Sequence, residues 1–211
     1  MERVIAYVDG FNLYFGLKSK GWKRYYWLNV KELASRLLRP NQMLVGTKYF
    51  TARINGPQGK RKRQSTFIEA LQTLSELEIM EGKYQLNRRL CRSCGFQDSV
   101  PSEKMTDVNI AVKLLEDAVL DSFDTALLIS ADADLTPAVN SLVKLFPAKR
   151  VVIAFPPDRY SAELAKSASA FFHIGRAPIA KSQSPLTVAK ADGFMLFCPV
   201  EWRSAQSVPT M

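Results

Sequence analysis

The chain has 211 residues, of which 47% are hydrophobic and 23% are charged, as is ordinary for one globular domain. It contains no apolar run near the roughly 18 residues of a membrane helix and no signal-peptide pattern, so neither segment is expected. Three cysteines, an odd number, argue against a secreted disulfide framework, and the expected location is a reducing cytoplasm. The formal charge of +9 favours a polyanionic partner, although a generically basic surface would give the same excess.

Strands and helices are expected to alternate along the chain. Apolar stretches predict strands at residues 3–9, 44–53, 79–90, 125–129, 150–155 and 171–174. Apolar residues at helical spacing predict helices at 13–18, 30–38, 67–77, 103–120, 135–145 and 161–168, with loops at 56–64 and 91–101. This alternation predicts βαβ units and a mostly parallel sheet.

The most informative segment is a strand, a pair of acids and a helix. The apolar run from Thr125 to Ile129 is typical of a buried parallel strand and stops at Ser130, after which Asp132 and Asp134 precede the next helix. Ligands bind outside the carboxyl ends of strands in open α/β sheets, so both acids are expected at a binding edge. The alternative is that Asp134 only caps the helix, which leaves Asp132 without a role.

Two other segments direct acids to the same edge. The first strand ends on Asp9, and Asn12 follows at the start of a helix. In the helix predicted over 103–120, the apolar stripe extends backward in steps of four to Asp107 and Glu103. Acids near a helix N-terminus gain from the helix dipole, so a purely structural role is the alternative.

Four or five carboxylates at one edge repel one another and need a cation. Oxygen ligands suit hard ions such as Mg²⁺ or Mn²⁺, and the sole histidine, His173, lies far along the chain, which argues against a zinc hydrolase. Metals held by carboxylates activate water and stabilise in-line displacement at phosphorus. A basic surface could hold the phosphate backbone meanwhile, so these residues predict a nuclease. The alternative is a set of caps and surface acids that never meet.

The chain resembles the NYN-domain proteins of the PIN-like nuclease superfamily, particularly the LabA-like branch. The resemblance rests on Val8-Asp-Gly-Phe-Asn-Leu-Tyr14, Glu103-Lys-Met-Thr-Asp-Val-Asn-Ile-Ala111 and Ser130-Ala-Asp-Ala-Asp-Leu-Thr-Pro-Ala-Val139, in the family's order. It implies a three-layer α/β/α sandwich over residues 1–176, PIN-like and Rossmann-like, with a C-terminal extension over 177–211. One departure is Ala131, where many members have glycine, and a residue this small should change little.

The resemblance also implies roles for individual residues in metal-dependent RNA cleavage. The implied metal ligands are Asp9, Asp107, Asp132 and Asp134, with Glu103 as a further candidate. Asn12 and Ser130 match the polar residues around the family's catalytic site.

Cys91 and Cys94, followed by Gly95, look like half of a zinc knuckle. A structural zinc needs four ligands, and only Cys198 and His173 remain in this chain. A second subunit could supply the missing pair, which makes a homodimer one alternative. A loop without metal is favoured over a structural Zn²⁺.

Cationic and aromatic residues could contact a nucleic acid. Lys60, Arg61, Lys62 and Arg63 lie in the predicted loop at 56–64, and they either contact phosphates or form a solvated surface. Lys104 is a further cation, off the apolar stripe of its predicted helix. The aromatic residues Tyr25, Tyr26 and Trp27 could stack on bases, although packing is favoured for at least one of them.

The sequence thus predicts a cytoplasmic Mg²⁺- or Mn²⁺-dependent ribonuclease that binds RNA, with no membrane partner. One alternative is a nucleic-acid-binding module that keeps the fold without turnover. Another is a metal-dependent phosphatase on a similar sheet. That chemistry usually needs an Asp-x-Asp nucleophile on the first strand, whereas this strand ends in Asp9-Gly-Phe-Asn12.

Overall fold

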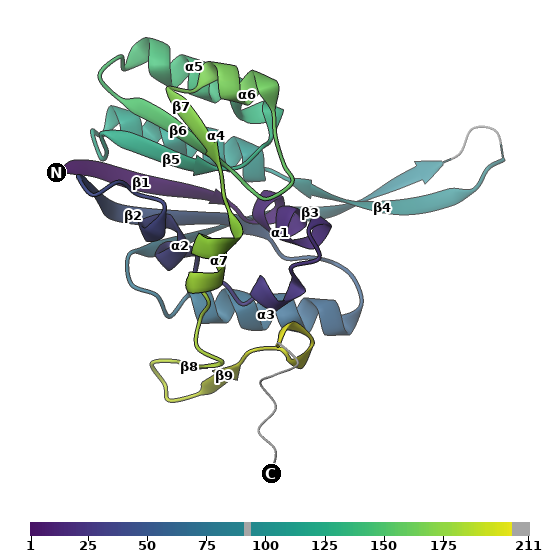
Figure 1. The fold of residues 1–211 in the computed structure, drawn as a ribbon. Coiled ribbons are helices and arrows are strands. Elements are labelled where there is room, and N and C mark those ends of the chain that lie inside the picture. Colours follow the sequence, from purple (N-terminus) through teal and green to yellow (C-terminus); the bar gives the residue numbers. More distant parts are fainter. Residues whose placement is uncertain (91–93, 204–211) are drawn as a thin grey trace.

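The computed structural model describes residues 1–90 and 94–203 (Figure 1). The main-sheet strands are β1 (Glu2–Asp9), β2 (Gln42–Ala52), β3 (Leu77–Leu90), β4 (Gln97–Lys104), β5 (Thr125–Ile129), β6 (Arg150–Phe155) and β7 (Ala170–His173). The α-helices are α1 (Gly10–Ser19), α2 (Val30–Arg36), α3 (Gln58–Leu71), α4 (Thr106–Val119), α5 (Thr136–Leu145), α6 (Ala162–Ser167) and α7 (Arg176–Lys181). The short elements are 3₁₀ helices η1 (Lys23–Tyr25), η2 (Ala133–Leu135) and η3 (Val200–Trp202), and a hairpin of β8 (Thr187–Ala189) and β9 (Met195–Phe197).

The main sheet has seven strands in the order β4-β3-β2-β1-β5-β6-β7, and only β4 runs antiparallel to its neighbour. From β1 the chain builds outward to β2 and β3 on one side, and later to β5, β6 and β7 on the other. The strand order therefore reverses between β1 and β5, where Val8 pairs with Ile129. Open α/β sheets bind ligands at such a switch point, beyond the carboxyl ends of the two strands.

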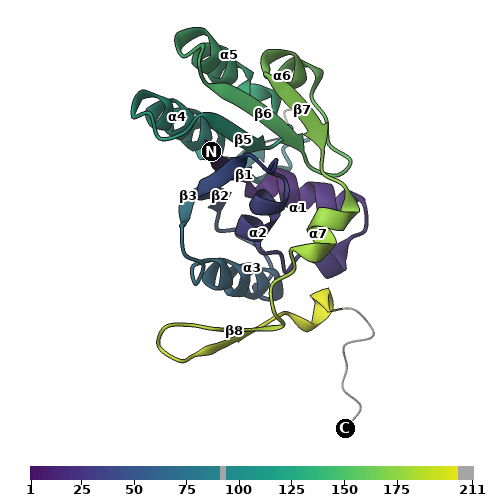
Figure 2. The same ribbon diagram turned by 60° about the vertical axis from the view of Figure 1, so that its left-hand side comes forward.

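Helices cover both faces of the sheet, and this confirms the predicted three-layer α/β/α fold. One face packs against α1, α2 and α7 through a core that includes Leu13, Leu33 and Ile179. The other face packs against α4, α5 and α6 through Ile110, Val139 and Leu164. Figure 2 shows the two helical layers on either side of the sheet. The central strands β1 and β5 are buried on both faces, which is why they read as continuous apolar runs.

A two-stranded arm extends from the sheet (Figure 1). The first part of β3 pairs with β2 as far as Gly82 opposite Ala52, after which β3 continues and pairs only with β4. The predicted loop at 91–101 was therefore wrong from residue 97 onward, while residues 91–93 lie outside the described part of the chain, and the predicted start of the helix at 103 was also wrong. Residues 97–104 form β4. Met105 follows in the left-handed backbone region, with a φ of 77°, and α4 begins at Thr106.

The segment before Phe67 also differs from the prediction. Residues 58–66 form the first turns of α3 rather than a loop, and α3 ends at Leu71 instead of continuing to residue 77. Lys, Arg and Gln are good helix formers, and Pro57 stands directly before the first turn, where proline does no harm. An exposed, highly polar helical turn has no apolar stripe, so its sequence looked like a loop.

The C-terminal part of the described chain folds back onto α3 (Figure 1). Leu196, Cys198 and Trp202 are buried with Trp27 and Ala70 in a small third core. The predicted boundary at residue 176 coincides with the first residue of α7, and it remains a prediction. Within the described residues, no helix is long and apolar enough to cross a membrane.

Candidate functional site

Asp9 lies at the switch point between β1 and β5. It is the last residue of β1 and the N-cap of α1, where its carboxylate accepts a hydrogen bond from the backbone N–H of Asn12 at 2.9 Å. The Asn12 side chain donates a second at 2.9 Å, and the Ser130 hydroxyl donates a third at 2.8 Å. Burial raises the pKa of Asp9, and these hydrogen bonds act against that rise.

The end of β5 brings the second acid to Asp9. Ser130 Oγ donates to Asp9 and accepts from the backbone N–H of Asp132 at 3.1 Å, so it connects the two strand ends. Asp132 is the N-cap of η2 and accepts from the backbone N–H of Asp134 at 3.0 Å. The alternative that Asp134 caps the following helix is therefore wrong: Asp132 caps η2, and α5 has no side-chain cap.

The third acid comes from the helix that returns from the arm. Asp107 is in the first turn of α4, as its helical spacing predicted. One carboxylate oxygen from each of Asp9, Asp107 and Asp132 lies within 4.8 Å of the others, and we call these three residues the acidic cluster. Asp134 is exposed and lies outside the cluster. Three of the four aspartates that the sequence singled out are thus brought together.

The acids of the cluster disfavour one another's charge. Burial, followed by the charges of neighbouring carboxylates with Asp132 first among them, raises the pKa of Asp107 to about 6. Asp134 contributes to this rise, so its charge acts on the cluster although its oxygens are not part of it. A cation placed among the three carboxylates would remove the repulsion, and oxygen donors alone suit a hard divalent ion.

Two residues predicted beside the site lie on a strand rather than on the helix that was predicted for them. Glu103 and Lys104 belong to β4, where Glu103 pairs with Tyr84 and Lys104 with Lys83, and their side chains lie outside the described part of the structure. Glu103 was placed on the stripe of α4 because a helix was assumed there, and that assumption was wrong. The strand predicted at 79–90 was found, whereas the segment that forms β4 was assigned to a loop and to the start of a helix.

The cysteine pair lies only partly within the described residues. Cys91 is outside them, whereas Cys94 is exposed with a free thiol. Of the ligands considered for completing a zinc site, Cys198 is buried in the third core, and the His173 ring lies tilted against Phe155 with ring centroids 5.4 Å apart. The zinc site stays a prediction.

The cations at 60–63 and the aromatic residues at 25–27 lie in three places: the core, a pocket and the exposed surface of α3. Tyr25 and Trp27 are buried, which confirms packing for these two. Tyr26 lines a pocket of about 390 Å³ together with Lys60 and Arg63 from α3. Arg61 and Lys62 lie on the exposed part of α3, away from this pocket.

Sequence reasoning missed the other aromatic residues of this pocket. Phe11 and Tyr14 come from α1, and Tyr49, Phe67 and Trp202 come from β2, α3 and η3. A signal was present in α1, where Phe11 and Tyr14 lie off the buried stripe that contains Leu13 and Leu17. No local signal could connect Trp202 with α1.

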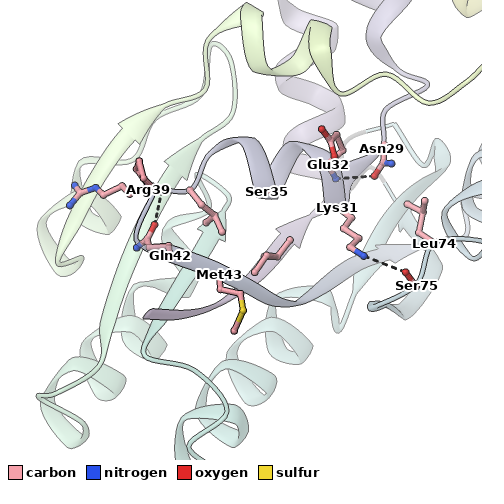
Figure 3. Close-up of a pocket in the computed structure, with 12 residues that line it drawn as sticks. Asn29, Lys31, Glu32, Ser35, Arg39, Gln42, Met43, Leu74 and Ser75 are labelled. Carbon is pink, nitrogen blue, oxygen red and sulfur yellow. Dashed lines mark hydrogen bonds between the residues drawn. The ribbon is translucent and has the colours of Figure 1, made fainter. Parts of the chain in front are cut away.

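A second pocket, of about 700 Å³, lies at the end of the sheet opposite to the acidic cluster. It is lined by residues of α2 and the start of β2, so it faces the amino ends of the strands (Figure 3). Several of its polar groups already bond one another, such as Lys31 with Ser75 at 3.3 Å and the Gln42 side chain with the backbone of Arg39 at 3.0 Å. This pocket lies far along the strands from the acidic cluster.

A family model describes most of this chain. The model of the NYN domain matches residues 3–175, which include the whole acidic cluster. The chain belongs to the NYN domain family. This family is part of the PIN-like nuclease superfamily, so the protein is a member of a nuclease-type family. In this chain the acidic cluster lies at the switch point.

Two individual proteins are similar to this NYN-domain chain. A 6-hydroxy-3-succinoylpyridine 3-monooxygenase of Pseudomonas putida is 25% identical over 177 residues, which cover 66% of this chain and 55% of that protein. The chain thus spans about half the length of this relative. A crystal structure of a protein of unknown function from Vibrio parahaemolyticus aligns with a TM-score of 0.54 at 18% identity, covering 83% of this chain and 94% of that one. The latter likeness supports the fold alone.

Proposed function

We propose that this protein is a Mg²⁺- or Mn²⁺-dependent ribonuclease that hydrolyses phosphodiester bonds at the acidic cluster. The observation that carries the proposal is the meeting of three carboxylate oxygens within 4.8 Å at the switch point of a nuclease-type fold. The +9 charge of the chain supports a polyanionic substrate, because Lys and Arg side chains bind phosphates with release of counterions.

The acidic cluster fits a hard divalent cation in donor type and spacing. Oxygens that bind Mg²⁺ at about 2.0–2.1 Å lie about 2.9 Å apart at adjacent positions and about 4.2 Å apart across the ion, so the three carboxylate oxygens, which lie within 4.8 Å of one another, would move closer together around a bound ion. Asp9, Asp107 and Asp132 would hold the ion. A metal so held polarises a phosphoryl oxygen and lowers the pKa of bound water.

The neighbouring residues have roles that follow from their hydrogen bonds. Ser130 and Asn12 use three hydrogen bonds to fix the Asp9 carboxylate, so we propose that they orient a ligand rather than bind metal themselves. Asp134 is exposed beside the cluster with its carboxylate outside it. We propose that Asp134 accepts a proton from the attacking water, whose oxygen bonds to phosphorus as the P–O bond of the leaving nucleotide breaks.

Cleavage of a labelled single-stranded RNA, with chelator and with added Mn²⁺, tests the proposal. The wild type should cleave only with the metal, and Asp132→Asn should abolish cleavage while keeping the hydrogen bond at the start of η2. Ser130→Ala should lower the rate by about 10–100-fold, the usual effect of removing a group that orients a metal ligand. Glu163→Gln, which changes an exposed acid in the first turn of α6, is the matched control and should be unaffected.

The same experiment separates the alternatives. If the wild type binds RNA but never cleaves it with Mn²⁺, the protein is a nucleic-acid-binding module on this fold. If it hydrolyses a phosphomonoester and leaves the oligonucleotide intact, it is a phosphatase. Cleavage by Asp132→Asn at the wild-type rate would remove the acidic cluster from the mechanism.

A further inference from the structure

The pocket lined by Tyr26 includes the residue that follows Asp9 of the acidic cluster. Gly10 lines this pocket and follows Asp9 directly in the chain, so one turn at the end of β1 borders both. The pocket lies between α1, α3 and η3, and its volume of about 390 Å³ falls in the usual range for small-ligand sites. We call it the aromatic pocket.

Aromatic rings form much of the wall of the aromatic pocket. Ring centroids are 5.0 Å apart for Tyr14 and Tyr26, 5.7 Å for Tyr26 and Trp202, and 6.3 Å for Phe67 and Trp202. Tyr14 is 40% exposed, so part of its ring is open to a ligand. Burial raises the pKa of Tyr26 to about 12, which keeps its phenol neutral at physiological pH. A wall of neutral rings favours a flat, unsaturated ligand that can stack.

The charged residues of the pocket all have the same sign. Among the described residues that line it, Lys18, Lys23, Lys60 and Arg63 are cations and none is acidic. On α3, the pocket residues 60, 63, 64 and 67 have the i, i+3, i+4, i+7 spacing of one helix face. Arg63 is paired with Glu201 at 2.6 Å, whereas Lys60 is exposed and lines the pocket. The pocket therefore favours an aromatic group that carries a negative charge.

We propose that the aromatic pocket binds one nucleobase of the RNA strand, with the phosphate of that nucleotide near Lys60. The proposal rests on the proposed ribonuclease function, and it adds a base-binding subsite that sets which phosphodiester reaches the acidic cluster. The base stacks on Tyr14 and Tyr26, and the strand passes over Gly10 to Asp9. Because stacking accepts any base, the subsite fixes position along the strand more than sequence.

Binding of mononucleotides in chelator tests the subsite without cleavage. Asp132→Asn is titrated with UMP and AMP by calorimetry, and with inorganic phosphate and pyridine-3-carboxylate in parallel. The mononucleotides should bind, and inorganic phosphate should bind at least about 10-fold more weakly because it lacks a ring to stack. Tyr14→Ala and Lys60→Ser should each weaken nucleotide binding about 5-fold or more, whereas Tyr14→Phe should keep it.

Two matched controls keep the test specific. Lys62→Ser changes an exposed cation on the same helix but away from the pocket, and Tyr160→Ala removes an exposed ring that lies against Phe155. Neither should change nucleotide binding. Equal weakening by Tyr14→Ala and Tyr160→Ala would overturn the proposal, as would binding of pyridine-3-carboxylate but not of nucleotides.

The outcomes also separate this inference from the proposed function. If wild-type protein cleaves RNA with Mn²⁺ but binds no mononucleotide, the subsite is refuted and the ribonuclease stands. If mononucleotides bind through Tyr14 but no RNA is cleaved, the ribonuclease is refuted, and the base-binding pocket stands as part of a binding module.

Discussion

Replacing Asp107 by asparagine should stabilise the metal-free protein. Burial and neighbouring charges raise the Asp107 pKa from 3.8 to about 6, and a shift of about two units corresponds to about 3 kcal/mol. Because Asp107 is partly exposed, screening reduces this to about 1–2 kcal/mol. Losing the favourable interaction with the N-terminus of α4 removes about 0.3–1 kcal/mol. The net gain is on the order of 1 kcal/mol, or a Tm rise of about 2–4 °C for this chain length.

The advantage of Asp107→Asn should depend on pH in a defined direction. An acid whose folded pKa is raised binds more protons in the folded state than in the unfolded chain between about pH 4 and 6. The contribution of Asp107 to wild-type stability therefore decreases as pH rises through that window. Asparagine does not titrate, so the difference between variant and wild type should be small near pH 4.5 and full at pH 7.5.

Calorimetric melting in chelator at both pH values measures this difference. Glu163→Gln, also in the first turn of a helix, should show no gain that grows between pH 4.5 and pH 7.5. Added Mn²⁺ should then stabilise the wild type more than Asp107→Asn, because binding to the folded state raises Tm by mass action. If Asp107→Asn is less stable at both pH values and responds to Mn²⁺ like the wild type, Asp107 is an ordinary first-turn acid.

Three further substitutions test neighbouring parts of the structure. Asp134→Asn should reduce RNA cleavage but keep the Mn²⁺-induced rise in Tm, because this carboxylate lies outside the acidic cluster; loss of the rise would make Asp134 a ligand. Gly10→Ala should lower stability by about 1–3 kcal/mol in denaturant unfolding, since the added Cβ would lie 2.5 Å from Tyr49 Oη. Lys48→Met should cost about 3–5 kcal/mol by the same measurement, because it removes the 2.5 Å ion pair of the buried Asp117, and Asp117→Leu added to it should recover part of the loss.

The sequence by itself determined the architecture and the position of the main acids. Buried parallel strands are apolar on both faces, so β1 and β5 could be recognised from short runs of residues. The carboxyl ends of parallel strands meet at one edge, which placed Asp9 beside Ser130 and Asp132 without any coordinates. Asp107 was found for a related reason, because helical spacing reports which side chains share a face.

Only the tertiary structure decided what lies around those acids. Glu103 was assigned to a helix because its spacing from Asp107 fits a helical stripe, whereas β4 is set by its antiparallel pairing with β3. The aromatic pocket depends on Trp202 reaching Tyr26 across 176 residues of chain, and such a contact is set by packing rather than by local sequence. Local patterns report which face of an element is buried, whereas the partner that buries it is chosen only when the whole chain folds.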